Sequence, residues 1–204
     1  MSRISRNELL YPGCHAHVIS RSIRKIRLFS EEEDFEKFKG LLQIAKRTGG
    51  FQIYHYCVMR THFHLAVKMG DVSSFSDALR DLKRSYAYWF HAKHRMSGPL
   101  WRERYRSLLV ENEQYLYTCG QYIENNPVKA GIVERSEQWV HSSGRHWVSG
   151  DKDDLVDAYE SHVHTVMNLT FDEKEFEAGS VIGSSFFRFQ FYDSRRRGVT
   201  CPRG

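Results

Sequence analysis

The chain has 204 residues, of which 41% are hydrophobic and 14% aromatic, so it can bury a core and fits one domain with an appendage. Thirty Lys and Arg residues against 25 Asp and Glu give a formal net charge of +5, a mild basic bias that alone does not establish a polyanionic partner. The sequence has no long apolar run, and its first residues lack the apolar segment of a signal peptide. We therefore expect a soluble cytoplasmic protein that makes no use of a membrane.

The first part of the chain alternates strand and helix patterns. Residues 14–21 predict a strand with alternating inward side chains. A capping-box sequence at residues 30–33 predicts the start of a helix, and the two glycines at 49–50 predict its end. Residues 51–59 and 62–68 are rich in aromatic and branched side chains and are separated by very few residues, so they predict a β-hairpin.

The middle of the chain adds two helices and a strand. Ser73 can cap a second amphipathic helix, and residues 106–110 predict a fourth strand. Asn112 is placed to cap a third helix that runs to Asn125, because Pro127 cannot extend a helix. The resulting β-α-β-β-α-β-α order predicts an α+β, ferredoxin-like or RRM-like fold. Its antiparallel sheet would carry helices on one face and leave the other face free.

The patterning weakens after about residue 140. We therefore divide the chain into a main domain, residues 1–145, and a mostly helical C-terminal extension with a basic tail, residues 146–204. Within the extension, residues 153–167 and 171–178 predict helices. The four cysteines form no Cys-x-x-Cys pair and are expected to be reduced, with those at positions 57 and 119 in the core.

A pair of histidines on the predicted hairpin is the first candidate for chemistry. His62 and His64 flank Phe63, so in an extended strand the two imidazoles share one face while Phe63 points into the core. Adjacent imidazoles on a rigid strand make half of a metal site. An isolated His-x-His is more often a half-buried strand that happens to carry two histidines, so the pair needs a second element.

That second element lies about sixty residues later, where Tyr122 and Asn126 are one helical turn apart on the same face. A phenol is a poor nucleophile at neutral pH unless a nearby cation polarises its target. The two histidines and the Asn126 carboxamide oxygen could hold Mg²⁺ or Mn²⁺ and leave positions open for phosphate oxygens. Tyr122 could instead be a core tyrosine, with Tyr115 nearly as good a candidate, and the Asn126 partner favours Tyr122.

Four segments of the chain form one recognisable set: HVISR (17–21), CVMRTHFHLAVK (57–68), GPLWRERYRSLLVE (98–111) and YIENNPVKAGIV (122–133). Together they resemble the REP-associated tyrosine transposases, which are relatives of the single-tyrosine HUH transposases of small bacterial insertion sequences. The resemblance extends from about residue 10 to residue 145.

The resemblance implies a role for each matched position. His62 and His64 correspond to the HUH metal ligands, and Asn126 corresponds to a polar third ligand. Tyr122 corresponds to the nucleophile that attacks single-stranded DNA, which gives a 5′-phosphotyrosine and a free 3′-OH. Residues 1–145 would then be the HUH catalytic domain, with a REP-type palindromic hairpin as the substrate. Related proteins act either as dimers that exchange the tyrosine helix or as monomers, so both states are open.

Basic residues surround these motifs, and a phosphate backbone with bases stacking nearby would suit them. The family usually has Pro-Asn before the first histidine, whereas this chain has Arg60 and Thr61, and Arg60 could add a phosphate contact. These basic residues could instead belong to a charged, solvent-exposed loop and to a tail that only increases solubility. The expected DNA contacts are Arg21, Arg24, Arg60, Trp101, Arg102, Arg104, Arg106, Arg195, Arg196 and Arg197.

Three functions remain open at this point. The leading one is a metal-dependent, site-specific single-strand DNA endonuclease and ligase acting as a transposase. The second is a catalytically vestigial nucleic-acid-binding module, whose sheet would display Tyr54, Tyr56 and Phe63 for base stacking. The third is an HUH replication-initiator nickase, which is less favoured because no helicase segment or second tyrosine motif follows Tyr122.

The basic tail leads to a separate prediction. If its arginines neutralise phosphates, they release counterions and make DNA affinity more dependent on salt. Deleting residues 194–204 should therefore flatten the slope of log affinity against log salt and weaken hairpin binding, with cleavage of saturating substrate preserved. A salt titration of both proteins measures this, and an unchanged slope would exclude the tail as a DNA contact.

Overall fold

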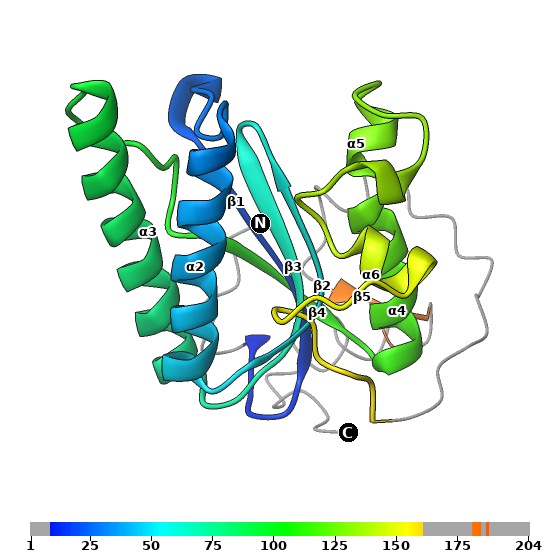
Figure 1. The fold of residues 1–204 in the computed structure, drawn as a ribbon. Coiled ribbons are helices and arrows are strands. Elements are labelled where there is room, and N and C mark those ends of the chain that lie inside the picture. The colour runs from blue at the N-terminus through cyan, green and yellow to red at the C-terminus, as the bar shows by residue number, and fades with distance from the viewer. Residues whose placement is uncertain (1–8, 161–180, 185–186, 188–204) are drawn as a thin grey trace.

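The computed structural model describes residues 9–160, 181–184 and 187, and Figure 1 shows how their elements are arranged. The strands are β1 (His15–Arg21), β2 (Gln52–Met59), β3 (His62–Lys68), β4 (Arg106–Val110) and β5 (Val181–Ile182). The helices are α2 (Glu32–Gly49), α3 (Val72–His94), α4 (Glu113–Glu124), α5 (Asn126–Lys129) and α6 (Gly144–Ser149), with 3-10 turns η1 (Ile23–Lys25) and η2 (Ser136–Gln138). None of the described helices is long and apolar enough to cross a membrane.

The strands form one sheet in the order β2-β3-β1-β4-β5. Strands β1 to β4 pair antiparallel, and β5 joins β4 in parallel. The first four strands therefore have the ferredoxin-like order, which confirms the predicted α+β class. Strand β5 was not predicted, because two residues are too few to show an alternating pattern.

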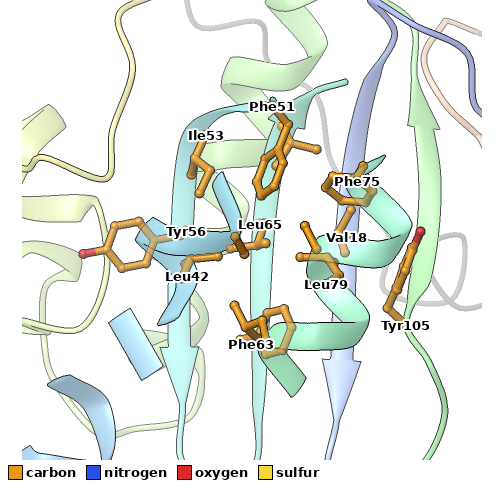
Figure 2. Packing of buried hydrophobic residues seen from close by; sticks show 14 of the residues in the cluster. Val18, Leu42, Phe51, Ile53, Tyr56, Phe63, Leu65, Phe75, Leu79 and Tyr105 are labelled. Atoms are coloured by element: carbon orange, nitrogen blue, oxygen red, sulfur yellow. The ribbon is translucent and has the colours of Figure 1, made fainter. Parts of the chain in front are cut away.

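Helices α2 and α3 cover one face of the sheet and enclose the larger apolar core (Figure 1). Phe63 and Leu65 of β3 and Val18 of β1 point to this face and are fully buried. They pack with Leu42 of α2 and Leu79 of α3, as Figure 2 shows. The side-chain alternation that turns Phe63 inward necessarily turns both of its histidine neighbours to the opposite face.

The opposite face is covered as well, so the expectation of a free face is wrong. Helix α4 packs across β1, β2 and β3, and α5 and α6 lie on the same side (Figure 1). Leu116, Cys119 and Ile123 recur at helical spacing on α4 and are fully buried against Cys57 and Ile19 of the sheet. An amphipathic helix must bury its apolar stripe, and this sheet face is where α4 buries it. Cys57 and Cys119 are free thiols in the core, as predicted.

Two of the predicted helix caps are shifted by one or two residues. Glu31, not Ser30, is the N-cap of α2. The Asp34 carboxylate accepts hydrogen bonds from the backbone N–H groups of Ser30 and Glu31, at 2.8 and 2.9 Å. Asp71, not Ser73, caps α3, since its carboxylate accepts from the third N–H beyond it. In both cases a carboxylate takes the place expected for a hydroxyl, which suits the positive end of the helix dipole.

The C-terminal extension differs from the prediction where the structure describes it. Residues 153–160 form no helix and instead run beside the edge strand β2. The Asp157 N–H donates to the Ile53 carbonyl, and the Ile53 N–H donates to the Asp157 carboxylate, both at 2.7 Å. The segment thereby satisfies backbone groups that an edge strand would otherwise expose. Residues 161–167 and the helix expected at 171–178 lie outside the described residues.

Candidate metal and DNA site

Strand β3 presents the two histidines together. His62 and His64 lie on the face that α4 covers, with their ring centroids 5.0 Å apart and their planes at 78°. Phe63 between them is fully buried on the other face. The structure thus brings the histidines side by side, as strand geometry requires.

Burial keeps both imidazoles neutral. Loss of solvation lowers the pKa of His62 to about 4, with the nearby Arg21 guanidinium adding to the effect. The pKa of His64 is lowered well below its usual value, chiefly by burial. A neutral imidazole offers a lone pair to a cation, so the burial that keeps these rings uncharged also keeps them available as ligands near pH 7.

A third histidine, which the sequence analysis missed, touches the pair. His17 of β1 is fully buried, and its Nε2 lies 2.9 Å from His64 Nδ1. The two ring planes differ by only 17° and their centroids are 5.2 Å apart, so the rings lie end to end and nearly coplanar. The signal was available, because alternation along residues 14–21 puts His17 on the face opposite Val18. The adjacency of β1 and β3 in a ferredoxin-like sheet then brings it to His64.

The remaining nitrogen of the His64 ring supports a cation site. His64 Nε2 is buried and has no hydrogen-bond partner among the described residues, and such an atom is costly to bury alone. Within the described part of the chain, no three His, Cys, Asp or Glu side chains are grouped to hold a metal. The histidine pair plus neutral oxygen donors therefore fits Mg²⁺ or Mn²⁺ better than a structural zinc, which takes four protein ligands.

Asn126 is held by the end of the tyrosine helix. Helix α4 ends at Glu124, and Asn126 begins the separate short helix α5, which carries Pro127 in its first turn. The Asn126 Nδ2 group donates to the carbonyls of Tyr122 and Ile123, each at 3.0 Å. These bonds fix which end of the carboxamide is the amide, so Oδ1 is left as an acceptor that a cation could use.

Tyr122 is the more accessible of the two candidate tyrosines. Its ring is partly buried against the apolar cluster beneath α4, whereas Tyr115 belongs to that cluster with only 8% exposure. The same cluster contains Ile19 and Met59, which pair with His64 and His62 in the sheet. The ammonium of Lys129 lies over the Tyr122 ring, 3.8 Å from its centroid, in a cation–π contact.

A buried polar network fixes α4 to the sheet. The Glu124 carboxylate contacts His55 Nδ1 at 2.7 Å and accepts a hydrogen bond from the Ser143 hydroxyl at 2.5 Å. The other His55 nitrogen contacts the Tyr159 hydroxyl at 2.8 Å. Gly120 leaves room for this ring, since a Cβ there would lie 2.1 Å from His55 Cδ2. The network holds the helix that carries Tyr122 at fixed height and rotation above β2.

The arginines nearest the histidines make the site electropositive. Arg21 pairs with His62 across the sheet, and Arg106 pairs with Ile19. After burial, the charges of Arg106 and Arg21 are the next causes that lower the pKa of His17, to about 3. Arg60 in the β2–β3 turn and Arg24 in η1 are exposed. Positive charge therefore lies beside the two histidines.

Trp101 is placed differently from the expected base-stacking platform. Its indole packs edge-on against Phe63 at 5.8 Å between centroids, and its N–H donates to the Lys83 carbonyl at 3.0 Å. The ring therefore anchors the loop before β4 in the core, and the expectation that it stacks on DNA is withdrawn. Arg102 and Arg104 of this loop are exposed, while residues 195–197 lie outside the described residues.

Two solved structures are similar to this chain. A solved structure of a REP-associated tyrosine transposase bound to a REP hairpin has a TM-score of 0.60 and 20% identity, and the match covers 79% of this chain and all of that one. A candidate transposase from Deinococcus radiodurans R1 matches with a TM-score of only 0.37 and 20% identity over 61% of this chain and 97% of its own. No curated protein matches.

The first of these likenesses shows the fold, and the family follows from the sequence itself. The family model described as IS200-like transposase matches residues 11–126, which is more than half of the 204 residues. The matched segment contains both histidines, Tyr122 and Asn126. The chain therefore belongs to the IS200-like transposase family.

Proposed function

We propose that this transposase is a metal-dependent, site-specific single-strand DNA endonuclease and ligase whose nucleophile is Tyr122. The observation that carries the proposal is the histidine pair, in which the buried Nε2 of His64 has no hydrogen-bond partner within the described part of the chain. The fixed carboxamide of Asn126 supplies an oxygen donor, and Arg21 supplies positive charge for a phosphate. Each of these features has a use at a phosphodiester, and together they have little use in a purely structural strand.

The roles of the residues follow from their chemistry. His62, His64 and Asn126 would hold Mg²⁺ or Mn²⁺, and Arg21 would neutralise a neighbouring phosphate. The bound cation would polarise the scissile phosphodiester and stabilise the charge that develops on it. Because α4 is fixed to the sheet, it would hold the Tyr122 hydroxyl in position for attack. Little conformational entropy would then be lost when the hydroxyl and the phosphodiester come together.

The covalent step conserves the phosphodiester bond energy. The Tyr122 oxygen forms a bond to phosphorus while the bond from phosphorus to the 3′ oxygen breaks. The phenol proton goes to solvent and the departing oxygen takes up a proton, which gives a 5′-phosphotyrosine and a free 3′-OH. The Lys129 ammonium packs over the ring in a cation–π contact that helps to hold the ring in place. Attack by a 3′-OH reverses the step, so ligation needs no nucleotide cofactor.

The substrate that fits best is a REP-type hairpin with a single-stranded flank. The support is the fold shared with a REP-associated tyrosine transposase that is bound to a REP hairpin. Glu124, two residues from Tyr122, is fixed to the protein's own sheet by His55 and Ser143. Helix α4 thus packs on the sheet of its own chain, which supports a monomer with Tyr122 acting in cis over a homodimer that exchanges the helix.

The vestigial nucleic-acid-binding module is less well supported. An RRM-like surface needs exposed aromatic side chains on an open sheet face. Tyr54, Tyr56 and Phe63 are at most 2% exposed, and α4 covers the face opposite α2 and α3. No observation favours the replication-initiator nickase over the transposase.

A covalent-capture assay tests the proposed function. The protein should attach to a hairpin oligonucleotide with a single-stranded flank when Mn²⁺ or Mg²⁺ is present, and a denaturing gel would show the adduct. EDTA should prevent the adduct without releasing the hairpin. Hairpin binding with no adduct under either metal, across a panel of flanks, would favour the vestigial binding module.

The metal role of His62 can be tested separately from the nucleophile. His62→Ala should lower Mn²⁺ affinity and cleavage together, by at least about a hundred-fold, because a direct ligand is lost. Hairpin affinity should be unchanged, since it depends on basic and stacking contacts. His91→Ala on α3, which covers the other face of the sheet, is the control and should retain both. Lost hairpin binding with cleavage of short unstructured strands spared would contradict the ligand role.

A further inference from the structure

Only one of the two nitrogens that meet between His17 and His64 can carry a proton. His17 Nε2 and His64 Nδ1 are 2.9 Å apart, and both rings are buried and neutral. In a hydrogen bond between neutral imidazoles, one nitrogen donates its N–H and the other accepts with its lone pair. Two arrangements are therefore available, and they leave the far side of the His64 ring in opposite states.

The ligand role of His64 requires one of them. If His17 donates, His64 carries its proton on Nε2, a buried nitrogen that then cannot bind a cation. If His64 Nδ1 donates, the His17 proton is on Nδ1, and His64 Nε2 keeps a bare lone pair. Each arrangement places one N–H on a buried nitrogen, so burial does not choose between them, and only the second offers the lone pair that a cation requires.

His62 has a similar partner at the same ring position. The Thr61 hydroxyl lies 3.0 Å from His62 Nδ1 and can accept a hydrogen bond from the N–H at this nitrogen. In both rings, therefore, Nδ1 is engaged by the protein and Nε2 is the nitrogen left for a ligand. A buried imidazole serves His64 in the way that a hydroxyl serves His62.

We propose that His17 is a positioning residue for the metal site: it accepts a hydrogen bond from the Nδ1–H of His64, fixes that ring in one tautomer and presents Nε2 to the cation. The inference rests on the proposed function for its purpose, because the cation is the one that the transposase would use. The tautomer itself is a property of the metal-free protein. Partners of this kind are known to tune metal ligands, and their loss lowers metal affinity about 10- to 100-fold.

The test compares three variants. His17→Leu removes the acceptor and keeps much of the apolar volume. His17→Gln restores an acceptor, because its carboxamide oxygen can reach the position that Nε2 occupies. His15→Leu is the matched control, since His15 is on the same strand and face but its ring lies near Tyr54 instead of His64.

The first readout is the ¹⁵N spectrum of the metal-free protein, which distinguishes imidazoles protonated at Nδ1 from those protonated at Nε2. His64 should carry its proton on Nδ1 in the wild type, in His15→Leu and in His17→Gln, and lose this preference in His17→Leu. Mn²⁺ affinity without DNA should fall about 10- to 100-fold in His17→Leu and recover most of the loss in His17→Gln. If His17→Leu does not fold, the spectra of the wild type and of His17→Gln still show whether His64 carries its proton on Nδ1.

The outcomes separate this inference from the proposed function. His64 protonated on Nε2 in the wild type would overturn the role of His17, whatever the protein does to DNA. An unchanged His64 tautomer and Mn²⁺ affinity in His17→Leu would overturn it equally. The expected tautomer and metal data, together with a wild-type protein that never forms a DNA adduct, would support His17 and refute the nuclease.

Discussion

Replacing Tyr122 by phenylalanine should abolish the covalent adduct with DNA and lower cleavage by at least about a thousand-fold. The change removes only the hydroxyl, and the ring can keep its contacts with the apolar cluster and with Lys129. Hairpin affinity and the free energy of unfolding should therefore stay close to those of the wild type. The measurement is a denaturing gel of the protein with a labelled hairpin, beside a binding titration.

Tyr115→Phe is the matched control for this experiment. Tyr115 lies on the same helix and loses the same hydroxyl, but its side chain is buried in the cluster beneath α4. This variant should form the adduct at nearly the wild-type rate. An adduct that persists in Tyr122→Phe and disappears in Tyr115→Phe would move the nucleophile to the other tyrosine.

The features that sequence predicted well are local ones. The alternation around Phe63 fixes which face His62 and His64 share, because strand geometry alone decides it. The Asn112 cap is confirmed, with the side chain accepting from the Tyr115 N–H, because a cap depends on a few adjacent residues. The strand order followed from the succession of elements.

The features that sequence missed depend on contacts between distant elements. The amphipathic pattern of α4 shows that one side must be buried, but not which surface receives it. Glu124 reads as a surface residue, yet it is 3% exposed because His55 and Ser143 bind it. The alternation of side chains along β2 could not predict that His55 faces α4. The register of β2 shifts between Ile53 and His55, and this irregularity puts Tyr54 and His55 on the same face of the sheet.

This buried network makes Gly120 the position where the smallest change should have a large effect. Gly120→Ala adds one methyl group, which would lie 2.1 Å from His55 Cδ2, closer than two carbon atoms can approach. The His55 ring or helix α4 must then move, and either movement disturbs the contacts to Glu124 and Tyr159. We expect a loss of about 3 kcal/mol in the free energy of unfolding, from overpacking and from unmet buried polar groups.

Gly40→Ala on α2 provides the matched control. Gly40 is an exposed helical glycine, and nothing lies within 4 Å of the position that its Cβ would occupy. The same substitution there should stabilise the protein by about 0.5 to 1 kcal/mol, because alanine loses less conformational freedom in a helix. Denaturant unfolding of both variants measures the difference in sign.

The Gly120 variant also connects stability to function. Because Tyr122 is on α4 two residues before Glu124, a displaced helix should move the nucleophile, so adduct formation should fall even under conditions where the variant is folded. Hairpin affinity should fall much less, since Arg21 and Arg60 are on other elements. A Gly120→Ala protein as stable as the wild type, with normal adduct formation, would mean that His55 and α4 are not packed as tightly as the structure has them.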